Sequence, residues 1–327
     1  MPRTNIDPAR RALWASLRLP VVAAPMFLVS GPELVVAACK AGIVGSFPNT
    51  NARTIEEYED CMRRVTDALA QARAADPSAR IAPWAANLIT HSSNVRLQQD
   101  LALIARYRPP LVITALGSPE PALDVVHAYG GLVIADVINL KYARKAAATG
   151  CDGLACIAVG AGGHTGHLSP FAFISAVREH FDGLVIVGGG ISDGWGVAGA
   201  VAAGADLVYM GTRFIPTPES LAPAGHKQMI VEHTAEDLLV SAGITGAAAS
   251  WLTPSLRAAG LDPQKMPERP DVDVKRANEP RRWRDIWSAG QGITTIHAVE
   301  PVAEVVLRLE QEYRAARARF AAIETAA

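Results

Sequence analysis

Two glycine clusters in this sequence have the composition of a phosphate-binding site. Residues 188–190 are three consecutive glycines, and residues 210–213 read Met-Gly-Thr-Arg. Because glycine has no side chain, backbone N–H groups there can approach phosphate oxygens closely, and a helix that begins near Asp193 would add its positive end. Three consecutive glycines also suit a simple tight turn between a strand and a helix. The two clusters together favour a phosphate ligand.

The second chemical signal is a histidine framed by glycines. Residues 160–167 read Gly-Ala-Gly-Gly-His-Thr-Gly-His, with His164 inside the frame and His167 at its edge. Glycines leave such a ring unobstructed and let a flat ligand pack close to the backbone, which suits a general base. A lone histidine is more often structural, but the frame favours catalysis for His164 and leaves His167 open. A metal site is disfavoured because the two histidines have no third ligand in view.

The elements that must position these residues form a repeating pattern. Eight runs are nearly continuously apolar, as in parallel strands that are covered on both faces. Helices are expected between them, for example at 54–74, 95–107 and 193–203, with Asp193 as the N-cap of the last. The expected strands are 21–26, 42–47, 81–88, 111–116, 132–137, 153–158, 184–190 and 207–214.

This alternation predicts an α/β protein with the fold of a (β/α)8 TIM barrel. Open, doubly wound sheets usually stop at about five or six strands, whereas eight strand-helix units close a barrel. In such barrels the loops after the seventh and eighth strands commonly bind phosphate. The glycine clusters lie at the ends of the expected strands 184–190 and 207–214, and the histidine frame follows 153–158. All three would therefore face one mouth of the barrel.

Other residues at strand ends would share this mouth. Ala24, Pro25 and Met26 end the first expected strand, Asn87 ends the third and Asp136 ends the fifth. Asn87 can donate and accept hydrogen bonds, so it suits the pyrimidine edge of a flavin or a turn cap equally. An ionised Asp136 would oppose negative charge on a reduced flavin ring, unless it faces N–H groups or is protonated.

The repeating pattern breaks between residues 215 and 288, a stretch rich in proline. A small, mostly helical insertion is expected here, with one helix from His226 to Ala242. The barrel would then comprise residues 1–214 and 289–327, and its last helix would run from about Val299 to Ala322. An insertion after the eighth strand would cover the mouth as a lid or a substrate wall.

The densest basic run of the chain extends from Lys275 to Arg284. Contact with a phosphorylated substrate or NADPH is one interpretation, but neighbouring acidic residues favour a solvated surface. Over the whole chain, 31 Lys and Arg residues nearly balance 32 Asp and Glu residues, which gives a net charge of −1. This balance provides no electrostatic footprint for nucleic acid or for an anionic membrane.

Cysteine usage and the N-terminal segment bear on the cellular compartment. The four cysteines are Cys39, Cys61, Cys151 and Cys156. They form no C-x-x-C pair, which suits packed thiols in a reducing compartment. Arg10-Arg11 and the apolar stretch 19–29 resemble an export signal, but Pro20 and Pro25 interrupt the stretch. No segment approaches the roughly 20 apolar residues of a membrane span, so a cytoplasmic location is expected.

Together these motifs resemble the nitronate monooxygenase family, once called 2-nitropropane dioxygenases, and the related FMN-dependent enoyl-ACP reductases. The resemblance runs from about residue 20 to 215 and resumes near Ala289. The histidine frame combined with Met-Gly-Thr-Arg-Phe is quite specific for the superfamily and much less specific for the substrate. The matching segments are AAPM at 23–26, AANL at 85–88, AGGHTG at 161–166, GGGISDG at 188–194, GADLVYMGTRF at 204–214 and SAGQG at 288–292.

The resemblance implies FMN as the cofactor and His164 as the catalytic base. Some members carry a lysine where this chain has Asp136, which leaves the tuning of the flavin and the choice of reductant open. The residues expected near the isoalloxazine are Ala24, Pro25, Met26, Asn87, Asp136, Gly162, Gly163 and Gln291, and those expected at the phosphate are Gly189, Gly190, Gly211 and Thr212.

The implied reaction is the oxidation of an alkyl nitronate by O2 to a carbonyl compound and nitrite, with His164 removing the α-proton of a neutral nitroalkane. An NAD(P)H:quinone reductase on the same barrel is the first alternative, and an enoyl-ACP reductase is the second. Barrel enzymes such as IMP dehydrogenase need a nucleophilic cysteine after the sixth strand, which this loop lacks. A non-catalytic binder of a phosphate ligand is least favoured, because His164 would then lack a task.

Overall fold

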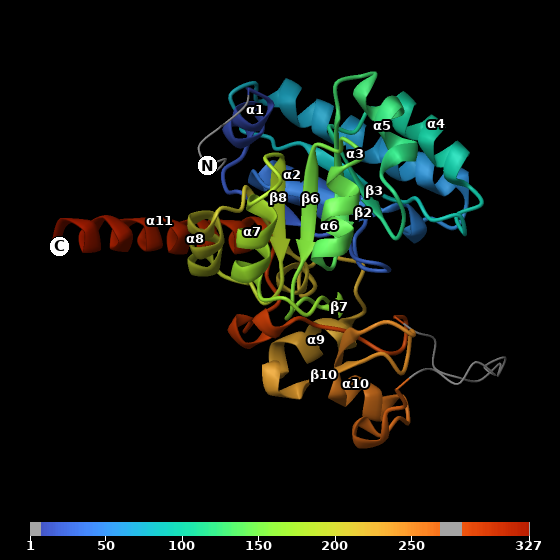
Figure 1. Ribbon diagram of the computed structural model, residues 1–327, viewed down its shortest axis with the longest axis vertical. Coiled ribbons are helices and arrows are strands. Elements are labelled where there is room, and N and C mark those ends of the chain that lie inside the picture. The colour runs from blue at the N-terminus through green and yellow to red at the C-terminus, as the bar shows by residue number, and fades with distance from the viewer. Residues whose placement is uncertain (1–7, 269–282, 327) are drawn as a thin grey trace.

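Eight parallel strands form a closed barrel in the computed structural model, which describes residues 8–268 and 283–326 (Figure 1). The predicted TIM barrel and its eight strands are therefore confirmed, with strand ends shifted by a few residues. The strands in barrel order are β1 (Val21–Ala23), β2 (Val44–Pro48), β3 (Trp84–Ile89), β4 (Leu111–Ala115), β5 (Leu132–Val137), β6 (Gly153–Ile157), β8 (Leu184–Gly188) and β9 (Leu207–Met210).

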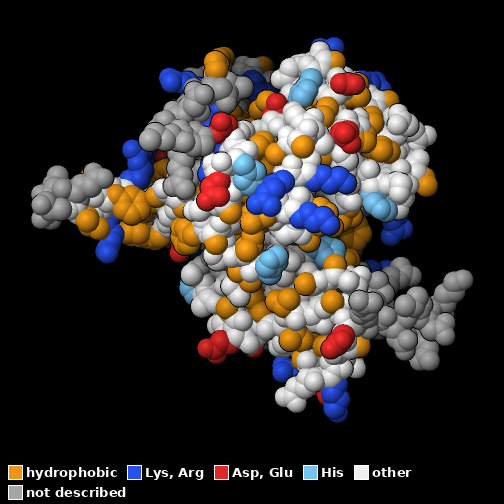
Figure 2. All heavy atoms as spheres, viewed as in Figure 1, with side chains coloured by type: hydrophobic (Ala, Val, Ile, Leu, Met, Phe, Trp, Pro, Cys, Tyr) orange, Lys and Arg blue, Asp and Glu red, His pale blue; other side chains and the backbone are white. Residues whose placement is uncertain are grey.

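Helices surround the barrel and connect successive strands (Figure 1). The barrel helices are α2 (Pro32–Ala41), α3 (Ile55–Ala75), α4 (Leu97–Tyr107), α5 (Glu120–His127), α6 (Leu140–Ala147), α7 (Pro170–Arg178), α8 (Gly194–Ala203) and α11 (Val302–Ala326). As predicted, Asp193 caps α8 by accepting the Gly196 N–H, and α11 returns to pack against α8 and α2. On the face shown in Figure 2, Lys and Arg side chains gather over α6. Among the described helices, none is long and apolar enough to cross a membrane.

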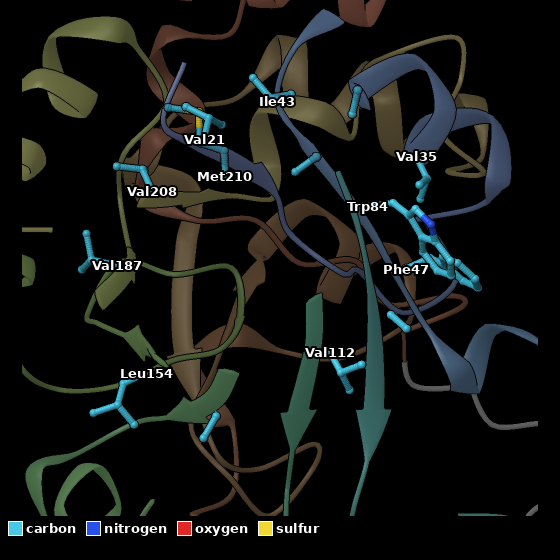
Figure 3. Packing of buried hydrophobic residues seen from close by; sticks show 14 of the residues in the cluster. Val21, Val35, Ile43, Phe47, Trp84, Val112, Leu154, Val187, Val208 and Met210 are labelled. Carbon is cyan, nitrogen blue, oxygen red and sulfur yellow. The ribbon is translucent and has the colours of Figure 1, made fainter. Parts of the chain in front are cut away.

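The strands divide the hydrophobic core into two layers, because successive side chains point to opposite faces. Val21 and Val208 lie in the layer between the strands and the helices, beside Met210 in Figure 3. Val22 and Tyr209 belong to the layer inside the barrel. The short helix α1 (Pro8–Ser16) adds Leu13 and the following Leu17 to that inner layer. It lies at the end of the barrel from which the β6 and β8 arrows point away (Figure 1).

The segment after β9 contains a small sheet that the sequence did not predict. Strands β10 (Leu238–Ser241) and β11 (Ala249–Leu252) pair antiparallel, and β11 also pairs with β7 (Gly163–His164). The helices of this segment are α9 (Ala224–Glu232) and α10 (Thr253–Ala258). Over the whole described chain, short 3₁₀ turns lie at 49–51, 212–214, 235–237, 263–265 and 291–295.

The expected helix from His226 to Ala242 is wrong beyond Glu232. Thr234 and Asp237 form a capping box that starts a new 3₁₀ turn, and the Leu238–Ser241 stretch then pairs with β11. This pairing is a long-range effect that local helix patterning does not report. Most of the basic run 275–284 lies outside the described residues, so the interpretation of that run stays a prediction.

All four cysteines are free thiols. Three of them, Cys39, Cys151 and Cys156, are buried, and burial raises their pKa to about 12, 11 and 12 respectively. Cys61 is half-buried, and burial raises its pKa as well. A thiol with a raised pKa is a weak nucleophile near neutral pH. The interpretation of these residues as packed thiols is confirmed.

A buried ion pair anchors α7 to the N-terminal ends of β8 and β9. Arg178 donates to the carbonyl oxygens of Gly204 at 2.8 Å and Gly183 at 2.7 Å, and its guanidinium also contacts the Asp206 carboxylate. Asp206 accepts a further hydrogen bond from the Val185 N–H at 2.7 Å. Both side chains are almost fully buried. The pair therefore satisfies backbone groups where two strands begin.

Replacing Asp206 with Ala should destabilise the protein by about 3–5 kcal/mol, because the substitution leaves the Arg178 charge buried without its partner. The free energy of unfolding from urea denaturation measures this loss. Asp60→Ala is the matched control: Asp60 pairs with Arg63 on the exposed surface of α3, where such pairs contribute up to about 1 kcal/mol. Similar losses in the two variants would contradict the structural role of the buried pair.

Candidate active site

A large cavity opens at the C-terminal ends of the strands, on the side of β7, α9 and α10 in Figure 1. Its volume is about 1320 Å³. The structure brings nearly all of the predicted site residues to its walls. The predicted residues that line it are Ala24, Pro25, Met26, Asn87, Asp136, Gly162, Gly163, His164, Gly189, Gly190, Gly211 and Thr212.

The loop after β8 requires glycine on steric grounds. Gly189 has a φ of 147°, and a Cβ atom there would lie 2.5 Å from the carbonyl oxygen of Val159. Any side chain would therefore displace the loop after β6. Because β8 pairs with β9, Gly189 and the Gly211-Thr212 pair share one end of the cavity. The two glycine clusters of the sequence thus form one surface.

The N-terminus of α8 is less available to an anion than the sequence suggested. Asp193 accepts the Gly196 N–H at 2.7 Å, and Glu312 of α11 accepts the Gly194 N–H at 2.8 Å. Two carboxylates therefore already use donors of the first turn. Their negative charges also offset the positive end of the helix dipole.

The carbonyl oxygen of Gly160 joins three loops. It accepts hydrogen bonds from the N–H groups of Gly190 at 3.0 Å and Gln291 at 2.9 Å. The N–H of Gly190 is therefore engaged within the protein, so Gly190 offers a bare surface to a ligand rather than a donor. Gln291 lies against Gly160 and Gly190 but is not among the residues that line the cavity.

Thr212 retains a hydroxyl proton that it can donate in a hydrogen bond to an anion. Its Oγ1 accepts the Gly290 N–H at 2.8 Å, and a hydroxyl that accepts one bond can still donate its proton. Gly162 packs against the same segment, since a Cβ atom on Gly162 would lie 2.7 Å from the Gly290 nitrogen. The segment 288–292 thus closes tightly on the glycine loops.

His164 reaches the cavity from β7, which the β11 strand holds by pairing Ala249 with His164. The imidazole meets Trp283 edge to face, with 5.4 Å between the ring centroids. Trp283 has a φ of 66°, which is costly for a bulky residue and marks a position held by its surroundings. Burial lowers the pKa of His164 below its ordinary value. The ring is therefore neutral near pH 7 and can accept a proton.

Asp136 places a carboxyl group in the cavity wall without a counter-charge. Burial raises its pKa from 3.8 to about 7, and the nearby Tyr209 hydroxyl opposes this rise only weakly. The Asp136 Oδ1 and the Tyr209 hydroxyl are both buried, and neither makes a hydrogen bond of good geometry within the described part of the chain. Asp136 is therefore substantially protonated near neutral pH, one of the two cases that the sequence left open.

Asn87 and Met26 line the cavity from β3 and from the end of β1. The Asn87 side-chain amide donates to the carbonyl oxygen of Ile113 at 3.0 Å, which orients the side chain and leaves its Oδ1 to accept from a ligand. The Met26 backbone is held by the Ser30 hydroxyl at 3.0 Å. The Met26 sulfur lies close to the space above Gly211. These residues provide one acceptor and one apolar contact.

Sequence reasoning missed many residues of the cavity wall, among them His226, Trp283 and Tyr209. His226 of α9 stacks on Trp287 at 5.3 Å and donates from Nε2 to the Ser288 carbonyl oxygen at 3.1 Å. Burial lowers the pKa of His226 to about 4. Trp283 and Tyr209 also line the cavity. Of these three, Tyr209 alone had a signal, because it is a polar residue at an inward position of an apolar strand.

Among the described residues, no three His, Cys, Asp or Glu side chains are grouped to hold a metal ion.

A family model for nitronate monooxygenase matches residues 10–312 of this chain. The chain belongs to the nitronate monooxygenase family. Enzymes of this family are flavin-dependent oxidoreductases.

Individual relatives agree with this membership. The nitronate monooxygenase of Paraburkholderia phytofirmans is 27% identical and is matched over 93% of this chain and 95% of its own length. The (3aS,4S,5R,7aS)-5-hydroxy-7a-methyl-1-oxo-octahydro-1H-indene-4-carboxyl-CoA dehydrogenase of Rhodococcus jostii is 30% identical, over 69% of this chain and 60% of its own length. The structure of nitroalkane oxidase from Streptomyces ansochromogenes has a TM-score of 0.78 at 24% identity, and the match covers 94% of this chain and 99% of that one, so the two share a fold.

The cavity fits a flavin. The glycine surface leaves room for a phosphate beside the Thr212 hydroxyl. Asn87 offers a free acceptor, and Asp136 offers a carboxyl group whose Oδ1 has no partner within the described residues. Buried polar atoms without partners are uncommon in native proteins and indicate a group that binds there.

Substituting Gly189 with Ala should weaken flavin binding about tenfold or more, since the new Cβ atom displaces the Val159 carbonyl and the glycine surface. A fluorescence titration of flavin-free protein with flavin measures the change in dissociation constant. Gly130→Ala is the matched control, because Gly130 has a φ of 79° but open space around its Cβ position. Equal flavin affinity in both variants would refute the steric argument.

Asp136→Asn should change how stability depends on pH in the flavin-free protein. Because the folded pKa is raised from 3.8 to about 7, wild type loses stability as the pH rises through this window, and then levels off. The variant cannot titrate, so its unfolding free energy relative to wild type should rise by on the order of 4 kcal/mol between pH 4 and pH 8.

Urea denaturation across this pH range provides the measurement. Asp67→Asn removes a carboxylate from the exposed surface of α3 and serves as the control. A constant difference between Asp136→Asn and wild type at all pH values would show that Asp136 is not held protonated by burial.

Proposed function

We propose that this protein is an FMN-dependent enzyme that oxidises alkyl nitronates with O2 to a carbonyl compound and nitrite. The observation that carries the proposal is the position of His164. It reaches, on β7, into the same cavity as the glycine surface formed by Gly189, Gly211 and Thr212. A base and a phosphate-binding surface in one cavity suit a flavin enzyme that handles carbon acids.

The glycine surface supports FMN among the flavins, because it offers a phosphate site after the seventh and eighth barrel strands, where this fold commonly binds phosphate. When bound, FMN would supply the redox chemistry by taking an electron from the nitronate, so that O2 can add to the nitronate carbon. Gly162 and Gly163 line the cavity and would lie near the ring, and the Gln291 N–H ties its segment to the Gly160 carbonyl.

The side chains of the cavity divide the remaining tasks. His164 takes the α-proton of a neutral nitroalkane at a ring nitrogen, and the lowered pKa keeps that nitrogen unprotonated near pH 7. Asn87, which the Ile113 carbonyl oxygen orients, would hold the pyrimidine edge of the flavin with Oδ1 as the acceptor. Ala24, Pro25 and Met26 form an apolar wall.

Asp136 in its protonated form avoids an uncompensated negative charge next to the ring. An ionised carboxylate there would repel negative charge on a reduced flavin, whereas the neutral acid can donate a hydrogen bond. A bound ring would also displace water from the carboxyl group, which favours the neutral form further.

We further propose that residues 215–288 act as an outer wall inserted into a barrel made of 1–214 and 289–327. The wall contacts the catalytic histidine through β11 and through Trp283, whose ring packs on Trp251 with 4.5 Å between centroids. This packing narrows the cavity beside His164 and would limit the size of substrates.

The visible spectrum of the purified protein tests the cofactor and the reaction together. A yellow protein whose anaerobic flavin is bleached by propyl nitronate, and which takes up O2 with it, supports the proposal. Anaerobic bleaching by NADH or NADPH without oxygen uptake from the nitronate would instead identify a quinone reductase. A colourless protein that cannot be reconstituted with FMN would refute both.

His164→Asn should retain FMN and lose turnover on neutral nitroethane by about 100-fold or more, because a positioned general base contributes about 10²–10⁴-fold. Turnover on preformed ethyl nitronate should fall less than tenfold, since no proton has to be removed. Steady-state oxygen consumption with each substrate form measures the two effects.

His167→Asn is the matched control, because His167 stands in the same loop but does not line the cavity. It should leave both rates near those of wild type. Equal losses on nitroethane and ethyl nitronate in His164→Asn would rule out a general-base role for His164.

A further inference from the structure

The cavity has a second side that the flavin site does not use. In the barrel order, β3 and β4 lie four strands away from β8 and β9, so their loops face the glycine surface across the mouth. This far side is lined by Val95 after β3 and Leu116 after β4, and it continues to Ile138, Tyr142 and Lys145, which follow the neighbouring strand β5. We call these five residues the far wall.

The far wall exposes large apolar side chains. Val95 is 94% exposed and Leu116 is 69% exposed, and Ile138 and Tyr142 are also exposed. Contiguous exposed apolar surface on a soluble domain marks a binding site more often than chance. These side chains also line the cavity, so a ligand that fills this side of it would cover them.

Leu116 is held in place at an energetic cost. Its φ is 62°, a left-handed conformation that is unfavourable for a leucine. The turn around it is fixed, because the Thr90 N–H donates to the Ala115 carbonyl oxygen at 3.1 Å and Gly117 packs directly on the Thr90 backbone. Strain that is maintained in this way is typical of positions that present a side chain to a ligand.

The same side of the cavity carries cations without partners. Lys145 and Arg53 line the cavity and are exposed, and neither forms an ion pair with the described residues. Arg96 nearby is already engaged by the carbonyl oxygens of Ala52 and Asn49. Among the described lining residues the one carboxyl group is Asp136, and burial raises its pKa to about 7. The cavity therefore attracts anions.

The cavity is large enough for two ligands. Its 1320 Å³ exceeds the roughly 300–1,000 Å³ of a pocket that holds one small molecule or cofactor. A flavin whose phosphate lies at the glycine surface would occupy the side of β8 and β9. The far wall would then remain open to a second molecule.

We propose that the far wall binds an apolar chain that ends in an anion, a carboxylate or a phosphate, with Lys145 and Arg53 as its counter-charges. The existence of this site is inferred only from the residues that line the cavity and does not depend on the proposed function. Its assignment to the substrate of the flavin reaction rests on the proposed function, and makes that substrate an amphipathic anion rather than a small nitroalkane.

Calorimetric titration of the flavin-loaded protein tests this site directly. Decanoate and decyl phosphate should bind, and the tighter of the two identifies the anion. Butyrate should bind at least tenfold more weakly than decanoate, because each buried methylene contributes about 0.8 kcal/mol. Decyltrimethylammonium, with the same chain and the opposite charge, should show no binding. Equal binding of decanoate and decyltrimethylammonium would overturn the proposal.

Two variants and one control separate the roles of charge and chain. Lys145→Gln should weaken decanoate about tenfold and leave 1-decanol unchanged. Leu116→Asn should weaken both ligands, and it should fold, because asparagine tolerates a positive φ. Lys40→Gln, an exposed lysine at the end of α2, should have no effect. Unchanged decanoate affinity in both Lys145→Gln and Leu116→Asn would refute the far wall as the site.

Failure of this site and failure of the proposed function give different results. Binding of decanoate by a protein that does not oxidise nitronates would support the site and refute the oxidation. Oxidation of propyl nitronate by a protein that binds neither decanoate nor decyl phosphate would refute the site and support the oxidation.

Discussion

The pairing of β1 with β9 is the interaction on which the rest of this structure depends. Val21, Val22 and Ala23 pair with Val208, Tyr209 and Met210, and this ladder joins the first strand to the last. Closure places every strand end on one rim, so that loops far apart in sequence become neighbours. Without it, the glycines after β8 and β9 and the histidine after β6 would still exist, but no shared cavity would join them.

Within that rim, backbone contacts of glycine decide the shape of the cavity. The Gly160 carbonyl ties the loop after β8 to the segment 288–292, and the Thr212 hydroxyl ties the same segment to the loop after β9. These bonds use groups that sequence reasoning had assigned to a phosphate, notably the Gly190 N–H. The glycines therefore serve the packing of loops first, and ligand binding falls to the surfaces and protons that this packing leaves free.

The barrel was predictable from the sequence because the patterns that identify its strands and helices are local. Continuous apolar runs identify buried parallel strands, and caps such as Asp193 mark helix starts. The sheet of β10, β11 and β7 was not predictable, since a two-residue strand at His164 exists only through pairing with β11. The sequence could not settle the protonation state of Asp136 for the same reason, because that state depends on burial, which no spacing in the sequence reports.

The cavity also shows how an acidic residue and an anionic ligand can share one space. A carboxyl group with a pKa of about 7 exists largely as the neutral acid below that pH, and a ring bound over it removes more water and favours that form further. The cations at Arg53 and Lys145 are exposed and form no ion pair with the described residues. The same burial that neutralises Asp136 thus leaves the mouth positive. A chain in which Asp136 stayed ionised would lose much of this contrast, and with it the preference for an anion.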